Sequence, residues 1–137
     1  MATADGDPAD ALFSVETIEH ILTQHEAEYF GNLRGLLKPG GTALLSTPNN
    51  EDIEAAKVFC PESGAVFHPM QHVRSFDAQS LPRLLSDNGF RPAETYVTDF
   101  GLSLRERPKQ WVADKGKRML GMGMPPPHLV CIAKLAG

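Results

Sequence analysis

The sequence predicts an α/β fold in which helices lie against one layered β-sheet. Short apolar runs of strand length alternate with segments whose apolar residues recur every three or four positions, the pattern of amphipathic helices. Clusters of proline, glycine and asparagine separate these segments and mark turns. With 137 residues, 42% of them hydrophobic, the chain is long enough to form one core. We expect a disordered polar N-terminus over residues 1–9 and one domain over residues 10–137.

Two strands with a helix between them are predicted in the first third of the chain. Residues 10–15 form an apolar run that indicates a buried strand, and residues 16–21 begin a helical turn directly after it. A helix is expected over residues 23–37. It ends at the Lys-Pro-Gly-Gly of residues 38–41, because proline cannot continue a helix and glycine adopts turn conformations. The apolar run at residues 42–47 predicts the second buried strand.

The helix over residues 23–37 is supported by a capping signal and by its apolar spacing. Thr23 followed by Glu26 fits a capping box, in which the two side chains satisfy backbone N–H groups of the first turn. The apolar residues expected on the buried face are Ala27, Phe30, Leu33, Leu36 and Leu37.

The rest of the chain predicts one long connection, a helix and two further strands. Residues 49–76 have no sustained periodicity, and a connection of this length is usually functional. Residues 77–88 predict an amphipathic helix with its leucines pointing inward and Gly89 as its C-terminal cap. Residues 95–100 and 128–133 predict the last two strands.

Charge and cysteine content narrow the functional classes. The net charge of −4 argues against a general nucleic-acid binder. Residues 104–120 nevertheless carry six basic side chains against two acidic ones, which indicates either a solvated helix face or a contact surface for an anionic substrate. No apolar run reaches the ~20 residues that a membrane helix needs. Two cysteines far apart in sequence do not suggest a disulfide framework, so a cytoplasmic location is expected.

The first predicted strand raises a question about its neighbours. If residues 10–15 lie inside a parallel sheet, the outer edge of that strand needs a hydrogen-bonding partner. Nothing N-terminal of it in this chain predicts one. We therefore expect either a chain that carries the missing strands or a homodimer formed through the exposed edge.

Five sequence blocks in order carry a resemblance to a known family. They are VETIEHI at residues 15–21, LLKPGG at 36–41, LSTPN at 45–49, HVRSF at 72–76 and LLSDNGF at 84–90. With these blocks the chain resembles the class I S-adenosylmethionine-dependent methyltransferases. The blocks span about residues 10–100, and the terminal strand fits the last strand of that family.

The resemblance implies a partial Rossmann-like methyltransferase fold. This chain would supply strands four to seven of a seven-stranded sheet, with the last strand antiparallel. The glycine-rich turn and the ribose-binding carboxylate of the family would lie in the absent N-terminal half, so the chain alone is expected to be inactive. By resemblance, Ser14, Val15, Glu16 and Thr17 would line S-adenosylmethionine at the carboxyl end of the first strand.

A carboxylate and histidine cluster follows the same strand. Glu16, Glu19 and His20 have the spacing i, i+3, i+4, which places them on one face of a helical turn. Such a group suits a divalent cation, and His68 or His72 in the long connection would be a further ligand. Cys60 with these two histidines fits no zinc spacing.

The cluster is similar to two methyltransferase subfamilies. The ubiquinone-biosynthesis O-methyltransferases share the Glu-x-x-Glu-His block, and the small-RNA 3′-terminal 2′-O-methyltransferases also share Ser-Thr-Pro-Asn and a later histidine block. The second resemblance implies that Glu16, Glu19, His20 and His72 bind Mg²⁺ or Mn²⁺. The alternative is a metal-free site in which His20 is the general base or bonds a backbone carbonyl.

The expected activity of the intact domain is methyl transfer to a hydroxyl oxygen of a small molecule or an RNA, because both subfamilies methylate hydroxyls. No membrane partner is expected. Two other functional classes stay open from sequence. One is a non-catalytic interaction module that docks through the first strand, and the other is a metal-binding or RNA-binding remnant of a methyltransferase.

Overall fold

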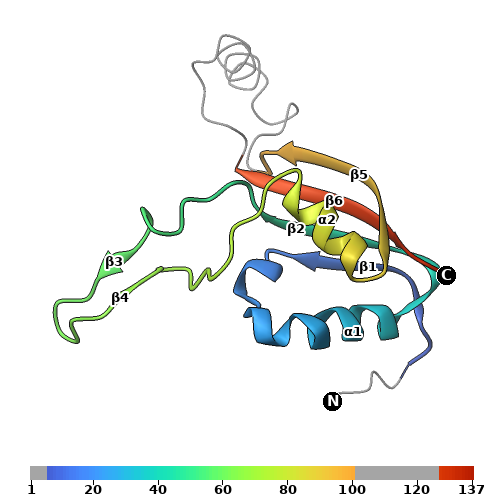
Figure 1. Ribbon diagram of the computed structural model, residues 1–137, viewed down its shortest axis with the longest axis horizontal. Coiled ribbons are helices and arrows are strands. Elements are labelled where there is room, and N and C mark those ends of the chain that lie inside the picture. The colour runs from blue at the N-terminus through green and yellow to red at the C-terminus, as the bar shows by residue number, and fades with distance from the viewer. Residues whose placement is uncertain (1–5, 101–126) are drawn as a thin grey trace, which may run out of the picture.

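A computed structural model describes residues 6–100 and 127–137 of the chain (Figure 1). The described elements, in chain order, are β1 (Ala9–Val15), the 3₁₀ turns η1 (Ile18–His20) and η2 (Thr23–His25), α1 (Glu26–Leu36), β2 (Leu37–Pro48), β3 (Val58–Phe59), β4 (Val66–Phe67), α2 (Ser80–Asp87), β5 (Phe90–Thr98) and β6 (His128–Leu135). None of the described helices is long and apolar enough to cross a membrane.

The main sheet has four strands in the order β1-β2-β6-β5. β1 and β2 are parallel and are joined through α1, whereas β6 runs antiparallel to both β2 and β5. Figure 1 shows α1 and α2 packed against this sheet. The α/β architecture and the antiparallel last strand predicted from sequence are confirmed.

The core lies between the two helices and one face of the sheet. Phe30 of α1 and Leu85 of α2 are fully buried, and they belong to the same apolar cluster as Leu45 of β2 and Leu129 of β6. Alternate residues of β2 and β6 therefore point to the helices, as a pleated strand requires. Burying such leucine and phenylalanine side chains stabilises the fold by about 1.5–3 kcal/mol each.

The first helix is shorter than predicted. A 3₁₀ turn occupies Thr23–His25 and the α-helix begins only at Glu26, with no side-chain capping bond at either start, so the predicted capping box is wrong. Phe30, Leu33 and Leu37 are buried as expected, but Ala27 and Leu36 are exposed. The spacing of three and four identified the helix, yet its buried face is narrower than the apolar pattern suggested.

The Lys-Pro-Gly-Gly segment lies within β2 instead of forming a free turn. The pairing with β1 shifts there, because Ala9 is opposite Leu37 whereas Ala11 is opposite Thr42. Gly40 has a φ of +76°, the left-handed conformation that glycine adopts without steric cost. The glycine therefore produces an irregularity inside the strand, and the regular pairing begins at the predicted residue 42.

The remaining predicted elements are present with shifted ends. α2 begins at Ser80, three residues later than predicted, and Gly89 closes it with a φ of +86°. β5 begins at Phe90, five residues before the predicted strand. The connection predicted as irregular contains the short antiparallel hairpin β3–β4, which sequence periodicity did not reveal because each strand has only two residues. The basic segment 104–120 lies outside the described residues.

β1 forms one edge of the sheet, and its outer edge has no strand beside it among the described residues. Its side chains Phe13 and Val15 are 70% and 56% exposed on the face away from the helices. The parallel pairing predicted for this strand is confirmed, and so is its position at an open edge.

Candidate functional site

The candidate site begins where β1 ends. Glu16 takes the left-handed conformation with a φ of +46°, and its backbone N–H donates to the Ser46 carbonyl oxygen at 3.0 Å. This bend turns the chain away from the sheet and into η1, which carries Glu19 and His20. The carboxyl ends of β1 and β2 therefore lie side by side next to this bend. Ligands in open α/β sheets bind at this edge of the sheet.

Glu19 is a buried carboxylate without a well-formed hydrogen bond. Its side chain is 1% exposed, and neither carboxylate oxygen makes a hydrogen bond of good geometry to the described residues. Burial raises the pKa of Glu19, and the nearby Thr47 hydroxyl and its own backbone N–H oppose that rise only in part. A buried carboxylate in this state is stabilised either by a proton or by a cation.

His20 is held by the long connection between β2 and α2. Its Nδ1 lies 3.3 Å from the Gln71 carbonyl oxygen, so Nδ1–H donates there and Nε2 keeps the lone pair of the neutral ring. That Nε2 is 3.8 Å from Oε1 of Glu19. The Glu19 carbonyl oxygen in turn accepts the backbone N–H groups of Val73 and Arg74, which fixes the connection against η1.

His72 completes the cluster from the same connection. Its ring lies edge-on to that of His20, with ring centroids 4.9 Å apart. Its Nδ1 is 2.5 Å from Oε2 of Glu51, and Oε1 of Glu51 is 3.3 Å from Nε2 of His68. An ionised carboxylate only accepts hydrogen bonds, so Nδ1–H of His72 donates to Glu51, whereas Nε2 of His68 lies near the carboxylate without a hydrogen bond of good geometry.

His68 supports this arrangement and is not free to act as a ligand. Its Nδ1 accepts the backbone N–H groups of Met70 and His72, each at 3.3 Å, so Nε2 must carry the hydrogen. The ring is 5% exposed and stacks on His72 with centroids 4.6 Å apart. Glu51 therefore selects the tautomer of the neutral His72 ring in which Nε2 carries the lone pair, and His68 stacks against that ring.

Three residues with left-handed backbone conformations surround the cluster. Glu16, Asn50 and Gln71 have φ values of +46°, +53° and +58°, and none of them is glycine. They follow β1, follow β2 and precede His72, respectively. Residues held in such conformations cost about 1–3 kcal/mol each and concentrate at functional sites.

The structure brings together three of the four residues predicted to bind a metal. Potential ligand atoms of Glu19, His20 and His72 all lie within 4.8 Å of one another, and a second such group contains Glu51, His68 and His72. Glu16 stands apart from both groups. Its Oε1 accepts the Ser46 hydroxyl at 2.7 Å, and its Oε2 is 3.5 Å from Nδ1 of His128.

The residues predicted to line a cofactor lie at the end of β1 but point in different directions. Ser14 is buried, and its hydroxyl is 2.6 Å from that of Tyr29 on α1, whose pKa is raised by burial. Val15 is exposed on the opposite face of the strand. The Thr17 hydroxyl donates to the Val15 carbonyl oxygen at 2.9 Å. Ser14 thus ties the end of β1 to α1, whereas Val15 and Thr17 stay accessible.

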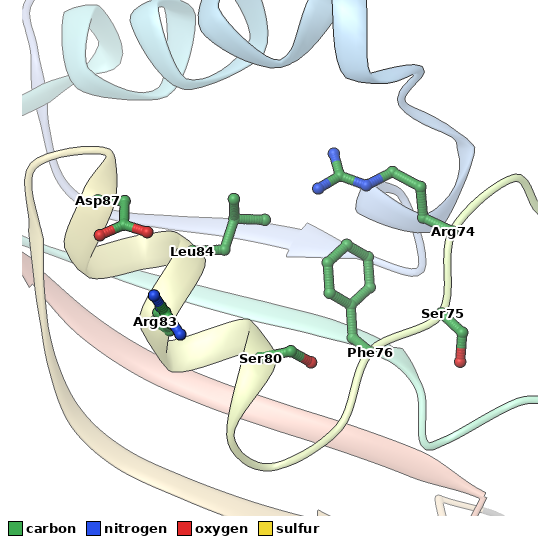
Figure 2. Close-up of a pocket in the computed structure, with 7 residues that line it drawn as sticks. All are labelled: Arg74, Ser75, Phe76, Ser80, Arg83, Leu84 and Asp87. Carbon is green, nitrogen blue, oxygen red and sulfur yellow. The ribbon is translucent and has the colours of Figure 1, made fainter.

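A separate hollow of about 470 Å³ lies between residues 74–76 and α2. Figure 2 shows Arg74 and Arg83 on its two sides, with Phe76 and Leu84 between them. The Arg74 guanidinium pairs with Glu26 at 2.7 Å and packs over the Phe76 ring. Among the described residues, neither group of converging ligand atoms includes a residue that lines this hollow.

Sequence comparison identifies the family. The sequence model of the methyltransferase domain matches residues 1–95. The chain belongs to the methyltransferase-domain family. A probable S-adenosylmethionine-dependent methyltransferase of Mycolicibacterium smegmatis is 31% identical over 97 residues, which cover 71% of this chain and 34% of that protein. The chain therefore spans about a third of the length of the curated relative it matches.

Solved methyltransferase structures share the fold. The Burkholderia thailandensis 1,6-didemethyltoxoflavin-N1-methyltransferase, solved with 1,6-didemethyltoxoflavin and S-adenosylhomocysteine, has a TM-score of 0.57 and 18% identity over 98% of this chain and 47% of its own. An S-adenosylmethionine-dependent methyltransferase from Mesorhizobium loti has a TM-score of 0.60 and 15% identity over 98% of this chain and 65% of its own. These likenesses confirm the partial Rossmann-like methyltransferase fold.

Sequence reasoning missed two groups of this candidate site. Glu51 was not singled out, although a carboxylate shortly after the Ser-Thr-Pro-Asn block could have drawn notice. The Gln71 carbonyl carries no sequence signal, because any residue supplies that group. His128 lies beside Glu16, since β6 runs antiparallel to β2 and His128 pairs with Pro48 at the end of that strand.

Proposed function

We propose that the domain to which this chain belongs transfers the methyl group of S-adenosylmethionine to a hydroxyl oxygen. The observation that carries the proposal is the convergence of Glu19, His20 and His72 beyond the carboxyl end of β1. A hydroxyl is a poor nucleophile until its proton is removed or its pKa is lowered, and this cluster offers the groups for either. The family membership and fold support methyl transfer as the reaction class.

The end of β1 fits one side of the cofactor. Val15 offers exposed apolar surface, Thr17 stays accessible, and the left-handed Glu16 opens the strand end between them. S-adenosylmethionine supplies a methyl group already activated on a sulfonium, so the protein mainly positions the acceptor. Ser14, bonded to Tyr29, would hold this strand end in place.

The donor set also fits a divalent cation held by Glu19, His20 and His72. The buried carboxylate of Glu19, which makes no hydrogen bond of good geometry, is the feature that a cation would stabilise. Glu16 leaves the proposed ligand set, because Ser46 already bonds its carboxylate. Two imidazoles with one carboxylate suit Mn²⁺ better than Mg²⁺, which prefers oxygen ligands. A bound cation would lower the pKa of the acceptor hydroxyl.

The metal-free alternative gives His20 the role of general base. The Gln71 carbonyl fixes the ring so that Nε2 carries the lone pair, which is the atom that would take the acceptor proton. Glu19 beside it would stabilise the imidazolium that forms. The two roles of His20 exclude each other, and cation binding discriminates between them.

The open edge of β1 supports the proposal that further strands complete the sheet. These strands would come from the remainder of a methyltransferase domain or from a second chain, because an unpaired parallel edge strand favours strand addition. The relatives are longer than the matched region, which agrees with this expectation.

Calorimetric titration with Mn²⁺ and with S-adenosylhomocysteine tests the proposal. We expect one Mn²⁺ per chain in the wild type, no saturable Mn²⁺ heat for Glu19→Gln, and retained binding for Glu16→Gln as the matched control. Wild-type binding that survives Glu19→Gln would remove the cation site and leave His20 as the base. S-adenosylhomocysteine binding is measured on the domain completed by the strands proposed to flank β1, and a completed domain that binds none would overturn the proposed function.

A further inference from the structure

A cavity of about 430 Å³ adjoins the histidine cluster on the side of the β3–β4 hairpin. Its wall is formed by the turn that follows β2 and by the segment that runs from β4 to His72. Figure 1 shows both segments leaving the sheet at the end where β2 finishes. The cavity has the size of a small-molecule site, which is commonly ~300–1,000 Å³.

The wall divides into an apolar part and a polar end. Ile53, Phe67 and Val73 supply apolar surface, whereas His68 and His72 supply the polar groups. Glu51 holds the His72 ring and two backbone N–H groups hold the His68 ring, so neither orientation depends on a ligand. A molecule seated here would place its apolar body against the aliphatic and aromatic side chains and its polar group toward His72.

The charges around the cavity argue against a phosphate-bearing occupant. Among the residues that line it, the one lysine is Lys57, whose Nζ lies 2.6 Å and 2.7 Å from the two carboxylate oxygens of Glu54. The Glu51 carboxylate lies behind the histidines. Nucleic-acid contacts need unpaired lysine or arginine side chains, and this wall offers a neutralised cation beside carboxylates.

We propose that this cavity holds the methyl acceptor, and that the acceptor is an uncharged small molecule with an aromatic or aliphatic body and a hydroxyl group. The assignment rests on the proposed hydroxyl methylation and adds its substrate class. It places the hydroxyl at His72, whose ring centroid lies 4.9 Å from that of His20. It favours a small acceptor over an RNA 3′ end, the two classes that the sequence left open.

The experiment uses 2-naphthol as the probe. Naphthalene-2-sulfonate, which has the same ring system but carries a negative charge, is the comparison compound. Methyl resonances of Ile53 and Val73 in ¹³C-labelled protein report occupancy directly. We expect saturable shifts at both residues with 2-naphthol and binding at least about tenfold weaker for the sulfonate, because the wall has no free cation. Shifts confined to other methyl groups, or equal binding of the anion, would overturn the proposal.

A pair of variants separates the cavity from general surface binding. Val73→Trp fills part of the cavity and should weaken 2-naphthol binding by about tenfold or more, because the indole occupies space that the probe needs. Val58→Trp is the matched control, because Val58 is similarly exposed, at 42% against 46% for Val73, but does not line the cavity. Circular dichroism establishes that both variants fold. Equal weakening in both, or in neither, contradicts the assignment.

Two further measurements keep this inference apart from the proposed cation site. With Mn²⁺ bound, the probe protons nearest the hydroxyl should broaden first; Mn²⁺ binding without such broadening would place the cavity away from the reacting centre. Probe binding in a protein that takes up no Mn²⁺ would leave the cavity assigned and remove only the cation. An RNA decamer with a free 2′,3′-diol should not shift the Ile53 methyl resonance, and a saturable shift there would overturn the small-molecule class.

Discussion

Oε2 of Glu51 lies 2.5 Å from Nδ1 of His72, and this contact sets which nitrogen of the imidazole keeps its lone pair. Because an ionised carboxylate accepts and does not donate, Nδ1 carries the hydrogen and Nε2 is left free. A carboxylate behind a histidine is the arrangement that orients histidine ligands in metal sites. Glu51 therefore orients a residue of the cluster, and the sequence-based prediction did not include this supporting carboxylate.

Glu51→Gln should disturb this orientation while keeping the side-chain size. A neutral amide can present its NH₂ group to Nδ1, so the other tautomer of His72 becomes accessible, and Mn²⁺ affinity should fall about 10- to 100-fold. ¹⁵N chemical shifts of the His72 ring report the tautomer in the metal-free protein, and calorimetry reports the affinity. Glu54→Gln, which removes a partner of Lys57, is the control. An unchanged tautomer in Glu51→Gln would contradict the supporting role.

Glu19→Gln should stabilise the metal-free protein at neutral pH. A raised carboxyl pKa means that the folded state binds a proton more tightly than the unfolded state, so the wild type loses stability as pH rises above the ordinary glutamate range. Glutamine has no charge to bury, so we expect a higher free energy of unfolding in EDTA at pH 7. Urea denaturation measures it, with the exposed Glu28→Gln as the comparison. A loss of stability would mean that the carboxylate is satisfied within the fold.

The contribution of Asp77 to the free energy of unfolding should depend on pH in the opposite sense to that of Glu19. Its Oδ1 accepts the backbone N–H groups of Gln79 at 2.9 Å and of Ser80 at 2.7 Å, and these bonds hold the pKa of Asp77 below its usual value. A depressed pKa adds stability that is present above the unfolded pKa and disappears as pH falls through the folded pKa. Asp77→Ala should therefore be less stable than the wild type at pH 7, and the two should converge in strong acid. Thermal denaturation across pH values tests this, and a difference independent of pH would refute it.

Two leucines on α2 provide a test of the core. Leu85 is fully buried in the main apolar cluster, whereas Leu84 is only partly buried against it. Leu85→Ala should lower the free energy of unfolding by about 2–5 kcal/mol, because truncation leaves a cavity in a packed interior. Leu84→Ala should cost clearly less in the same urea titration. An equal loss of stability in the two variants would show that α2 is rotated relative to this arrangement.

Much of the fold could be predicted because its signals are local. Alternating strand and helix patterns, a glycine at the end of α2 and the proximity of Glu19 to His20 depend on residues close together in the sequence. Element ends were less predictable. The capping box at Thr23 failed because a 3₁₀ turn takes the place of the first helical turn, and the β3–β4 hairpin was missed because strands of two residues have no measurable periodicity.

The sequence by itself determined the α/β class, the position of β1 at a sheet edge and the presence of carboxylate and imidazole groups after that strand. Only the tertiary structure decided which of these groups meet. It directed the Glu16 carboxylate to the Ser46 hydroxyl, and it brought Glu51 to His72. The physical reason is that contacts between distant residues depend on how the long connection docks, and here the Glu19 carbonyl oxygen fixes that connection by accepting the backbone N–H groups of Val73 and Arg74.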